Sequence, residues 1–139
     1  MTKRFFSAAP LWSATGLAII RIITGLLMVY HGLEVFDRTV MEGYLTWDVF
    51  KAMPAAAFMI YLGKSIELIT GICFTIGLFT RLAATFMMID MLFICFVVGD
   101  GRFYYQDQHP FLFAMIALVF FFTGPMRWSL DARLFGTET

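Results

Sequence analysis

The chain contains 139 residues, of which 60% are hydrophobic and 14% are charged, and its mean hydropathy is +0.81. A soluble domain of this length has too small a core to bury that much apolar surface, so the composition predicts an integral membrane protein. Because the formal net charge is zero, neither nucleic acid nor a strongly charged partner is expected. The lipid bilayer is the first predicted partner.

Four apolar windows approach the length of about 20 residues that a helix needs to cross a bilayer. They cover residues 11–33, 55–79, 82–99 and 110–127. With no repeat or second domain in the pattern, the sequence predicts an all-α protein in which residues 1–139 form a single integral membrane four-helix bundle. The first window runs past the length of a signal-peptide core and meets Arg21, so we expect it to remain as an anchor.

The connections between the windows differ in character. Residues 34–54 form a long polar stretch with Tyr44 and Trp47, two aromatic side chains typical of the headgroup level, and we expect a short interfacial helix there. Thr80 and Arg81 leave room only for a tight turn. The second and third spans are therefore predicted to form an antiparallel pair.

Basic residues near the span ends predict the orientation. One side of the membrane would hold Lys3, Arg4, Arg81, Arg127 and Arg133, and the other would hold Arg38, Lys51 and Arg102. The side with more positive charge faces the cytoplasm under the positive-inside rule. Both termini are therefore predicted to be cytoplasmic (N-in/C-in), and the longer loop between the first two spans faces outward.

Charged residues inside the predicted spans form the main anomaly of the sequence. They are Arg21, Lys64, Glu67 and Asp90. An isolated charge near the bilayer centre costs roughly 2.5 to 3.5 kcal/mol, so these side chains are expected to face one another. At about 1.5 Å per residue, Arg21 and Glu67 lie about 15 and about 18 Å above the cytoplasmic edge. This predicts an ion pair between Arg21 and Glu67, with Asp90 as a second acceptor for Arg21.

Lys64 and Glu67 are three residues apart, so they share one helix face, and that face is predicted to point into the bundle. Two interpretations of the buried charges stay open and do not exclude each other. In one, a polar cluster holds the helices in register. In the other, the cluster is a site for a polar or redox-active small molecule, because intramembrane ionisable residues often mark substrate or proton paths.

A second polar group is predicted toward the outer face. It consists of Tyr30, His31, Glu34, Tyr61, Lys64, Tyr104, Tyr105 and His109. A histidine or lysine can donate to a quinone carbonyl, carboxylates can carry its protons, and aromatic or methionine side chains can pack on its ring. The alternative is that the tyrosines are interfacial residues at the headgroup level and that His31 only forms hydrogen bonds with neighbouring groups of the protein.

The hypothesis of a quinone-type site assigns provisional roles to these residues. The candidate catalytic residues are His31 and Glu67. The candidate substrate-binding residues are Arg21, Tyr30, Tyr61, Lys64, Asp90 and His109. No protein-bound metal is predicted, although a haem between His31 and His109 is geometrically conceivable. Cys73 and Cys95 differ in predicted depth by about 10 Å, so no disulfide is expected.

Three segments of the chain resemble the DoxX-like family of small integral membrane proteins. They are RIITGLLMVYHG at 21–32, IELITGICFTIGLFTRLAA at 66–84 and GPMRWSLDARL at 124–134. The recurring family positions correspond to Arg21, Gly25, His31, Gly32, Glu67, Gly71, Gly77, Arg81, Gly124, Ser129, Leu130 and Asp131. The resemblance implies a multi-pass bundle in the cell inner (cytoplasmic) membrane that works beside oxidoreductases. One branch is related to the membrane subunit of a thiosulfate:quinone oxidoreductase, and another is linked to a complex with superoxide dismutase and a sulfurtransferase.

The closing segment has its own physical interpretation. Ser129 is suited to cap a short helix whose first turn carries Asp131. Arg81 lies on the same predicted side of the membrane and is expected to join this segment. Arg81 and Asp131 are therefore predicted to be structural.

Two functions from different classes follow from these features. The first is a membrane subunit of an oxidoreductase system that binds a quinone or a similar small molecule. No flavin, iron–sulfur or nicotinamide motif occurs in the sequence, so this function requires a protein partner in a redox complex to supply electrons. The second is a non-enzymatic scaffold or small-molecule carrier whose buried charges are structural. Whether the chain is an enzyme and whether it forms oligomers both stay open.

Overall fold

The fold of the described part of the chain, residues 10–136 of a computed structural model, is built from helices without any strand. The long helices are α2 (Ser13–Gly32), α5 (Ala56–Ile76), α6 (Thr80–Phe93) and α7 (Gln108–Thr123). A π-helix, η2 (Ile94–Val98), continues α6. Each predicted window overlaps one of these helices, and α6 and α7 each begin two residues before their windows.

Three segments within residues 10–136 are long and apolar enough to cross a membrane. They are Ser13–Phe36, Ala56–Ile76 and Thr80–Val98, whereas the apolar helix α7 is shorter. Large apolar side chains on their outer faces are exposed, including Ile23, Leu26, Ile69 and Ile89. Exposed apolar surface on this scale is expected where the solvent is lipid.

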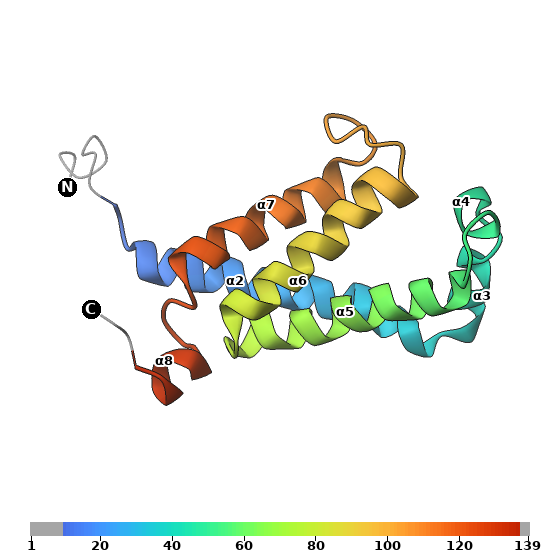
Figure 1. The fold of residues 1–139 in the computed structure, drawn as a ribbon. Coiled ribbons are helices and arrows are strands. Elements are labelled where there is room, and N and C mark those ends of the chain that lie inside the picture. The colour runs from blue at the N-terminus through green and yellow to red at the C-terminus, as the bar shows by residue number, and fades with distance from the viewer. Residues whose placement is uncertain (1–9, 137–139) are drawn as a thin grey trace.

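The long helices pack as two pairs, α2 along α5 and α6 along α7, and contacts between α5 and α6 join the pairs (Figure 1). A tight turn between the second and third spans is confirmed, but it lies at residues 77–79, and Thr80 and Arg81, where it was expected, belong to α6. The turn begins at Gly77, which ends α5 with a left-handed backbone at φ 68°. The core beside this turn contains Phe74 and Phe120, whose rings meet edge to face at 5.4 Å.

Glycines set the distance between α2 and α5. A Cβ atom on Gly25 would lie 2.5 Å from the amide nitrogen of Thr75, and one on Gly71 would lie 2.6 Å from the amide nitrogen of Val29. Side chains at these positions would force the two backbones apart. The close contact therefore fixes the register of α2 against α5, which decides which polar residues can meet.

A short helical segment, α8 (Leu130–Leu134), packs at one end of the molecule. The hydroxyl of Ser129 accepts a hydrogen bond from the amide of Ala132 at 3.2 Å, so the expected N-cap is confirmed. The carboxylate of Asp131 accepts hydrogen bonds from the amides of Phe79 and Thr80 at 2.6 and 2.8 Å. Asp131 thereby satisfies two amides at the start of α6 and ties the C-terminal segment to it.

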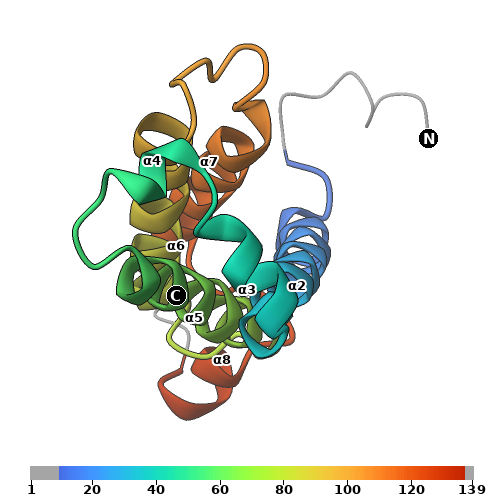
Figure 2. The same cartoon turned by 90° about the vertical axis from the view of Figure 1, so that its right-hand side faces the viewer.

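The opposite end is covered by a folded connection. After a 3₁₀ turn, η1 (Leu33–Phe36), the chain forms α3 (Arg38–Tyr44) and α4 (Asp48–Lys51). Figure 2 looks toward this end and shows both short helices in front of the ends of the long ones. The short helix expected between residues 34 and 54 is therefore confirmed, as a pair of helices.

The basic residues used to predict orientation separate along the molecule. Arg81, Arg127 and Arg133 lie at the end that carries α8 (Figure 1). Arg38, Lys51 and Arg102 lie at the end that carries α3 and α4. Lys3 and Arg4 lie outside the described residues.

Candidate functional site

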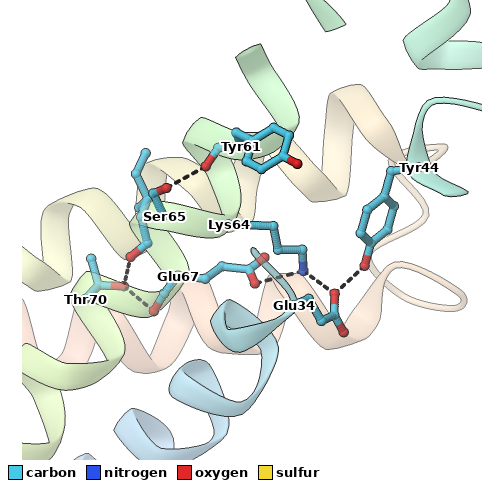
Figure 3. Close-up of polar contacts among 8 residues, drawn as sticks. Glu34, Tyr44, Tyr61, Lys64, Ser65, Glu67 and Thr70 are labelled. Atoms are coloured by element: carbon cyan, nitrogen blue, oxygen red, sulfur yellow. Dashed lines mark hydrogen bonds and ion pairs between the residues drawn. The ribbon is translucent and has the colours of Figure 1, made fainter. Parts of the chain in front are cut away.

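A compact charge network surrounds Lys64. Its ammonium nitrogen lies 2.9 Å from Oε2 of Glu67 and 3.0 Å from Oε2 of Glu34, as Figure 3 shows. Glu67 lies on the same helix three residues later, so the predicted shared face is confirmed. Lys64 therefore bridges two carboxylates from different helical elements.

Tyr44 completes this network from α3. Its hydroxyl donates a hydrogen bond to Oε2 of Glu34 at 2.5 Å, and its ring centroid lies 5.3 Å from the Lys64 nitrogen. Burial and the hydrogen bond to Glu34 raise the pKa of the Tyr44 phenol. The hydroxyl therefore stays protonated at neutral pH and acts as a donor.

Arg21 is not part of this network, and the predicted ion pair with Glu67 is wrong. The Arg21 side chain is 0% exposed, and its guanidinium donates hydrogen bonds to backbone carbonyl groups. The acceptors are the carbonyls of Phe74, Thr75, Arg127 and Trp128. Arg21 therefore joins α2, the end of α5 and the segment before α8.

The error has a geometric cause. The depth estimate assumed that both helices start level at the membrane edge, whereas the glycine contacts set a different register. Arg21 lies beside Phe74, and Glu67 is seven residues, or about 10 Å, farther along α5. The carbonyls left free at the C-terminal end of α5 then provide the acceptors that Arg21 needs.

Asp90 is also not an acceptor for Arg21, so that prediction is wrong. It lies on α6 beside Gly63, where a Cβ atom would be 3.4 Å from Oδ1 of Asp90. Asp90 is 6% exposed, and its Oδ2 has no hydrogen-bond partner within the described residues. A buried polar atom without a partner is rare in proteins and calls for an explanation.

Tyr44, Lys64, Glu67 and Asp90 border a cavity of about 370 Å³ near the end that carries α3 and α4. The predicted site residues that line it are His31, Lys64, Glu67, Asp90 and His109. The remaining wall is mostly apolar, with Met28, Met91 and Phe113 among its side chains. A cavity of this size with a few convergent polar groups is typical of a small-molecule site.

Two histidines from different helices meet at the cavity. The rings of His31 on α2 and His109 on α7 pack edge to face with centroids 5.5 Å apart. His109 also contacts the ring of Phe113 at 4.9 Å. The two imidazoles touch directly, so they do not frame the gap that a haem between them would require. No group of three or more His, Cys, Asp or Glu side chains in residues 10–136 is arranged to hold a metal ion.

Three predicted binding residues do not line this cavity. Arg21 lies at the other end of α5, as described above. Tyr30 is 70% exposed because it is the helical neighbour of His31 and points to a different side of α2. Tyr61 is also exposed and borders a separate pocket beside α3. The two remaining tyrosines of the predicted outer group, Tyr104 and Tyr105, are exposed as well.

Sequence reasoning placed Glu34 in the outer polar group but did not predict its ion pair with Lys64, and it missed the role of Tyr44. Glu34 follows His31 by three residues, and this spacing was an available signal that both reach the same side of the chain. Tyr44 offered no such signal, because it reaches Glu34 only after α3 folds back over the helix ends. An aromatic residue in a polar loop is more often an interfacial anchor.

Neither cysteine belongs to the site. Cys73 and Cys95 are both free thiols, in agreement with the expected absence of a disulfide between them. Cys95 is buried in the π-helix, and its sulfur donates a weak contact to the carbonyl of Asp107 at 3.6 Å. This contact ties the end of α6 to the loop before α7.

The chain is similar to bacterial membrane proteins along most of its length. The "Uncharacterized membrane protein Rv3486" of Mycobacterium tuberculosis is 29% identical over 149 aligned residues, which cover 92% of this chain and 91% of the relative. The "Putative oxidoreductase CatD" of Bacillus subtilis is 28% identical over 121 residues, which cover 86% of this chain and 87% of the relative. No solved structure matches.

The protein-family model named DoxX matches residues 16–100. This range contains most of α2 and all of α5 and α6, with the glycines that pack α2 on α5 and most of the polar residues of the cavity. The chain belongs to the DoxX family.

Proposed function

We propose that the protein is the membrane subunit of an oxidoreductase system, that it binds a quinone or a similar small molecule in the cavity, and that a partner protein supplies the electrons. One observation carries this proposal. Two histidines, one lysine and two carboxyl groups converge on a largely apolar cavity of about 370 Å³. The printed name of the Bacillus subtilis relative supports a link to oxidoreductases.

The residues that line the cavity would contribute in different ways, according to their chemical type. His31 and His109 carry ring nitrogens that can donate to a quinone carbonyl, and Lys64 is a second donor. Glu67 and Asp90 can take up or release the protons that accompany quinone reduction. Met28, Met91 and Phe113 provide apolar surface against which a flat ring can pack.

The proposal includes the placement of the chain in the membrane. All four long helices cross the cytoplasmic membrane as a bundle, with both termini and α8 on the cytoplasmic side. The separation of Arg81, Arg127 and Arg133 from Arg38, Lys51 and Arg102 supports this orientation. The cavity then opens in the outer half of the bilayer.

Binding can be measured through Trp47, which lines the cavity, whereas Trp12 and Trp128 lie toward the other end. A variant with Trp12→Phe and Trp128→Phe keeps Trp47 as its only tryptophan. Decylubiquinone should quench its fluorescence along a saturable curve, because quinones quench nearby indoles. The matched variant that keeps only Trp128 should show only the linear quenching due to quinone dissolved in the lipid. Identical linear curves would reject quinone binding.

A specific observation favours the alternative function of a scaffold or carrier. Lys64 is already paired with Glu34 and Glu67, so these charges satisfy one another without a ligand. Substituting Glu67→Gln separates the two functions. Quinone reduction in membranes that contain the whole system should fall at least tenfold if the residue carries protons, whereas a scaffold would lose thermal stability but keep turnover. Glu42→Gln, the same change in an exposed ion pair, is the control.

A further inference from the structure

One wall of the cavity also faces outward. Leu62 on α5 and Phe86 and Ile89 on α6 all line the cavity. The same side chains are 41%, 48% and 58% exposed. Because each of these side chains contacts both the cavity and the outer surface, they mark the place where the cavity opens. The cavity therefore reaches the surface between α5 and α6.

The end of the cavity away from α8 is lined by the α3–α4 segment. Tyr44, Trp47 and Phe50 contribute side chains there, of which Phe50 is buried and Trp47 is 48% exposed. In Figure 2 this segment lies in front of the ends of the long helices. The route between α5 and α6 is lined by apolar side chains at the level of the spans, so it leads into hydrocarbon and not into water.

A polar group lies directly behind this apolar rim. Gly63 leaves a gap in the α5 side of the opening, and Oδ1 of Asp90 is the nearest atom that a Cβ at Gly63 would meet, at 3.4 Å. Oδ2 of Asp90 is buried and has no hydrogen-bond partner among residues 10–136. The other acidic group that lines the cavity, Glu67, is already bonded to Lys64. Asp90 is thus the acidic group left free to bind a ligand.

We infer that the ligand is an amphiphile that enters from the bilayer between α5 and α6, places its polar head on Asp90 and leaves one long apolar chain lying across Leu62, Phe86 and Ile89. This inference rests on the proposed function, since it assigns the shape and the access route of the molecule bound in the same cavity. A carboxyl group can accept a hydrogen bond when ionised and donate one when protonated. Asp90 therefore suits a hydroxyl head and a carbonyl head alike.

Gly63→Leu tests the route, because the added side chain fills the gap at the rim. Gly16→Leu is the matched control, since Gly16 lies in α2 with no atom within 4 Å of a Cβ. The readout is the rise in Tm caused by each probe, measured on the full chain in lipid nanodiscs and compared with the same variant without probe. The probes are decylubiquinone, the tail-less ubiquinone-0 and the redox-inert 4-dodecylphenol.

The inference expects Gly63→Leu to weaken decylubiquinone and dodecylphenol binding at least tenfold and to change ubiquinone-0 binding less than twofold, with Gly16→Leu like wild type. If quinones bind but Gly63→Leu affects all probes equally or none, the lateral route is wrong and the proposed function stands. If dodecylphenol alone binds and depends on Gly63, the quinone function is wrong and the lateral site stands. If no probe raises the Tm of wild type, both are wrong.

Discussion

At the scale of single residues, the main finding is how the buried charges are distributed. Lys64 lies between Glu34 and Glu67, while Arg21 binds only backbone carbonyls about 10 Å away along α5. Removing one partner of a buried ion pair leaves the other charge buried and uncompensated, which strongly destabilises the folded protein. The two groups therefore act as separate polar contacts, one at each end of the α2–α5 pair.

We expect Lys64→Met to lower the free energy of unfolding by about 3 to 5 kcal/mol, because it leaves Glu67 buried without its cation. The double variant Lys64→Met/Glu67→Gln should recover part of this loss, since the more deeply buried carboxylate is then neutral and Glu34 keeps its hydrogen bond from Tyr44. Lys51→Met is the control, because its ion pair with Asp48 is exposed and should contribute less than about 1 kcal/mol. Unfolding titrations in detergent measure all three, and a double variant weaker than Lys64→Met would contradict the pairing.

Arg21→Met should also destabilise the protein, by about 2 kcal/mol or more, because several buried carbonyls lose their donor. Its effect should add to that of Glu67→Gln within about 0.5 kcal/mol, as for sites that share no partner. A double-mutant cycle by thermal or denaturant unfolding gives the coupling. A coupling above about 1 kcal/mol would mean that the two side chains interact after all.

At the scale of helices, glycines control the packing. Gly25, Gly32 and Gly71 lie where α2 and α5 approach most closely, and a Cβ at any of them would overlap the opposite backbone. Small residues at such contacts are the usual means of close helix packing in membranes, where lipid provides no hydrophobic drive between helices. This packing places His31 on the cavity and Arg21 at the turn after α5.

Gly71→Ala should destabilise the protein by about 2 kcal/mol or more, because the new methyl group would lie 2.6 Å from the amide of Val29. Gly16→Ala is the matched control in α2, where a Cβ meets no atom within 4 Å. It should stabilise by about 0.5 to 1 kcal/mol through helix propensity. Melting temperatures of the two variants should therefore move in opposite directions, and equal shifts would show that the close contact is not essential.

At the scale of the whole molecule, the two ends have different tasks. One end carries α8 and the contacts of Arg21 and Asp131, which join chain segments far apart in sequence. The other end carries the cavity under α3 and α4. Structural polar contacts and the candidate site are thus separated along the helices, so changes at one end should leave the other intact.

The proposed orientation can be tested with single cysteines in a variant that lacks Cys73 and Cys95. Lys51→Cys, in α4, should react with a membrane-impermeant maleimide in intact cells, because that end is expected to face outward. Arg133→Cys, in α8, should react only after the membrane is permeabilised. Both positions are exposed in the structure. The reverse pattern would place the cavity in the inner half of the bilayer.

Much of the fold could be predicted from the sequence, because apolar length and local spacing act within one segment. The helices at all four windows, the helix in the 34–54 connection, the Ser129 cap and the shared face of Lys64 and Glu67 are of this kind. The helices, the cap and the shared face depend on residues close together in the chain. Of the predicted site residues, His31, Lys64, Glu67, Asp90 and His109 reach the cavity, but their convergence depends on helices that are distant in sequence.

What the sequence by itself determined is therefore the composition of the helices and the presence of buried charges that need partners. Only the tertiary structure decided which partners those are. The position of a residue along its own helix does not determine how that helix is shifted along its neighbour. The close contacts at Gly25 and Gly71 set this shift between α2 and α5. With this register, Arg21 lies beside backbone carbonyls and Glu67 pairs with Lys64. Oδ2 of Asp90 has no hydrogen-bond partner in the described part of the chain.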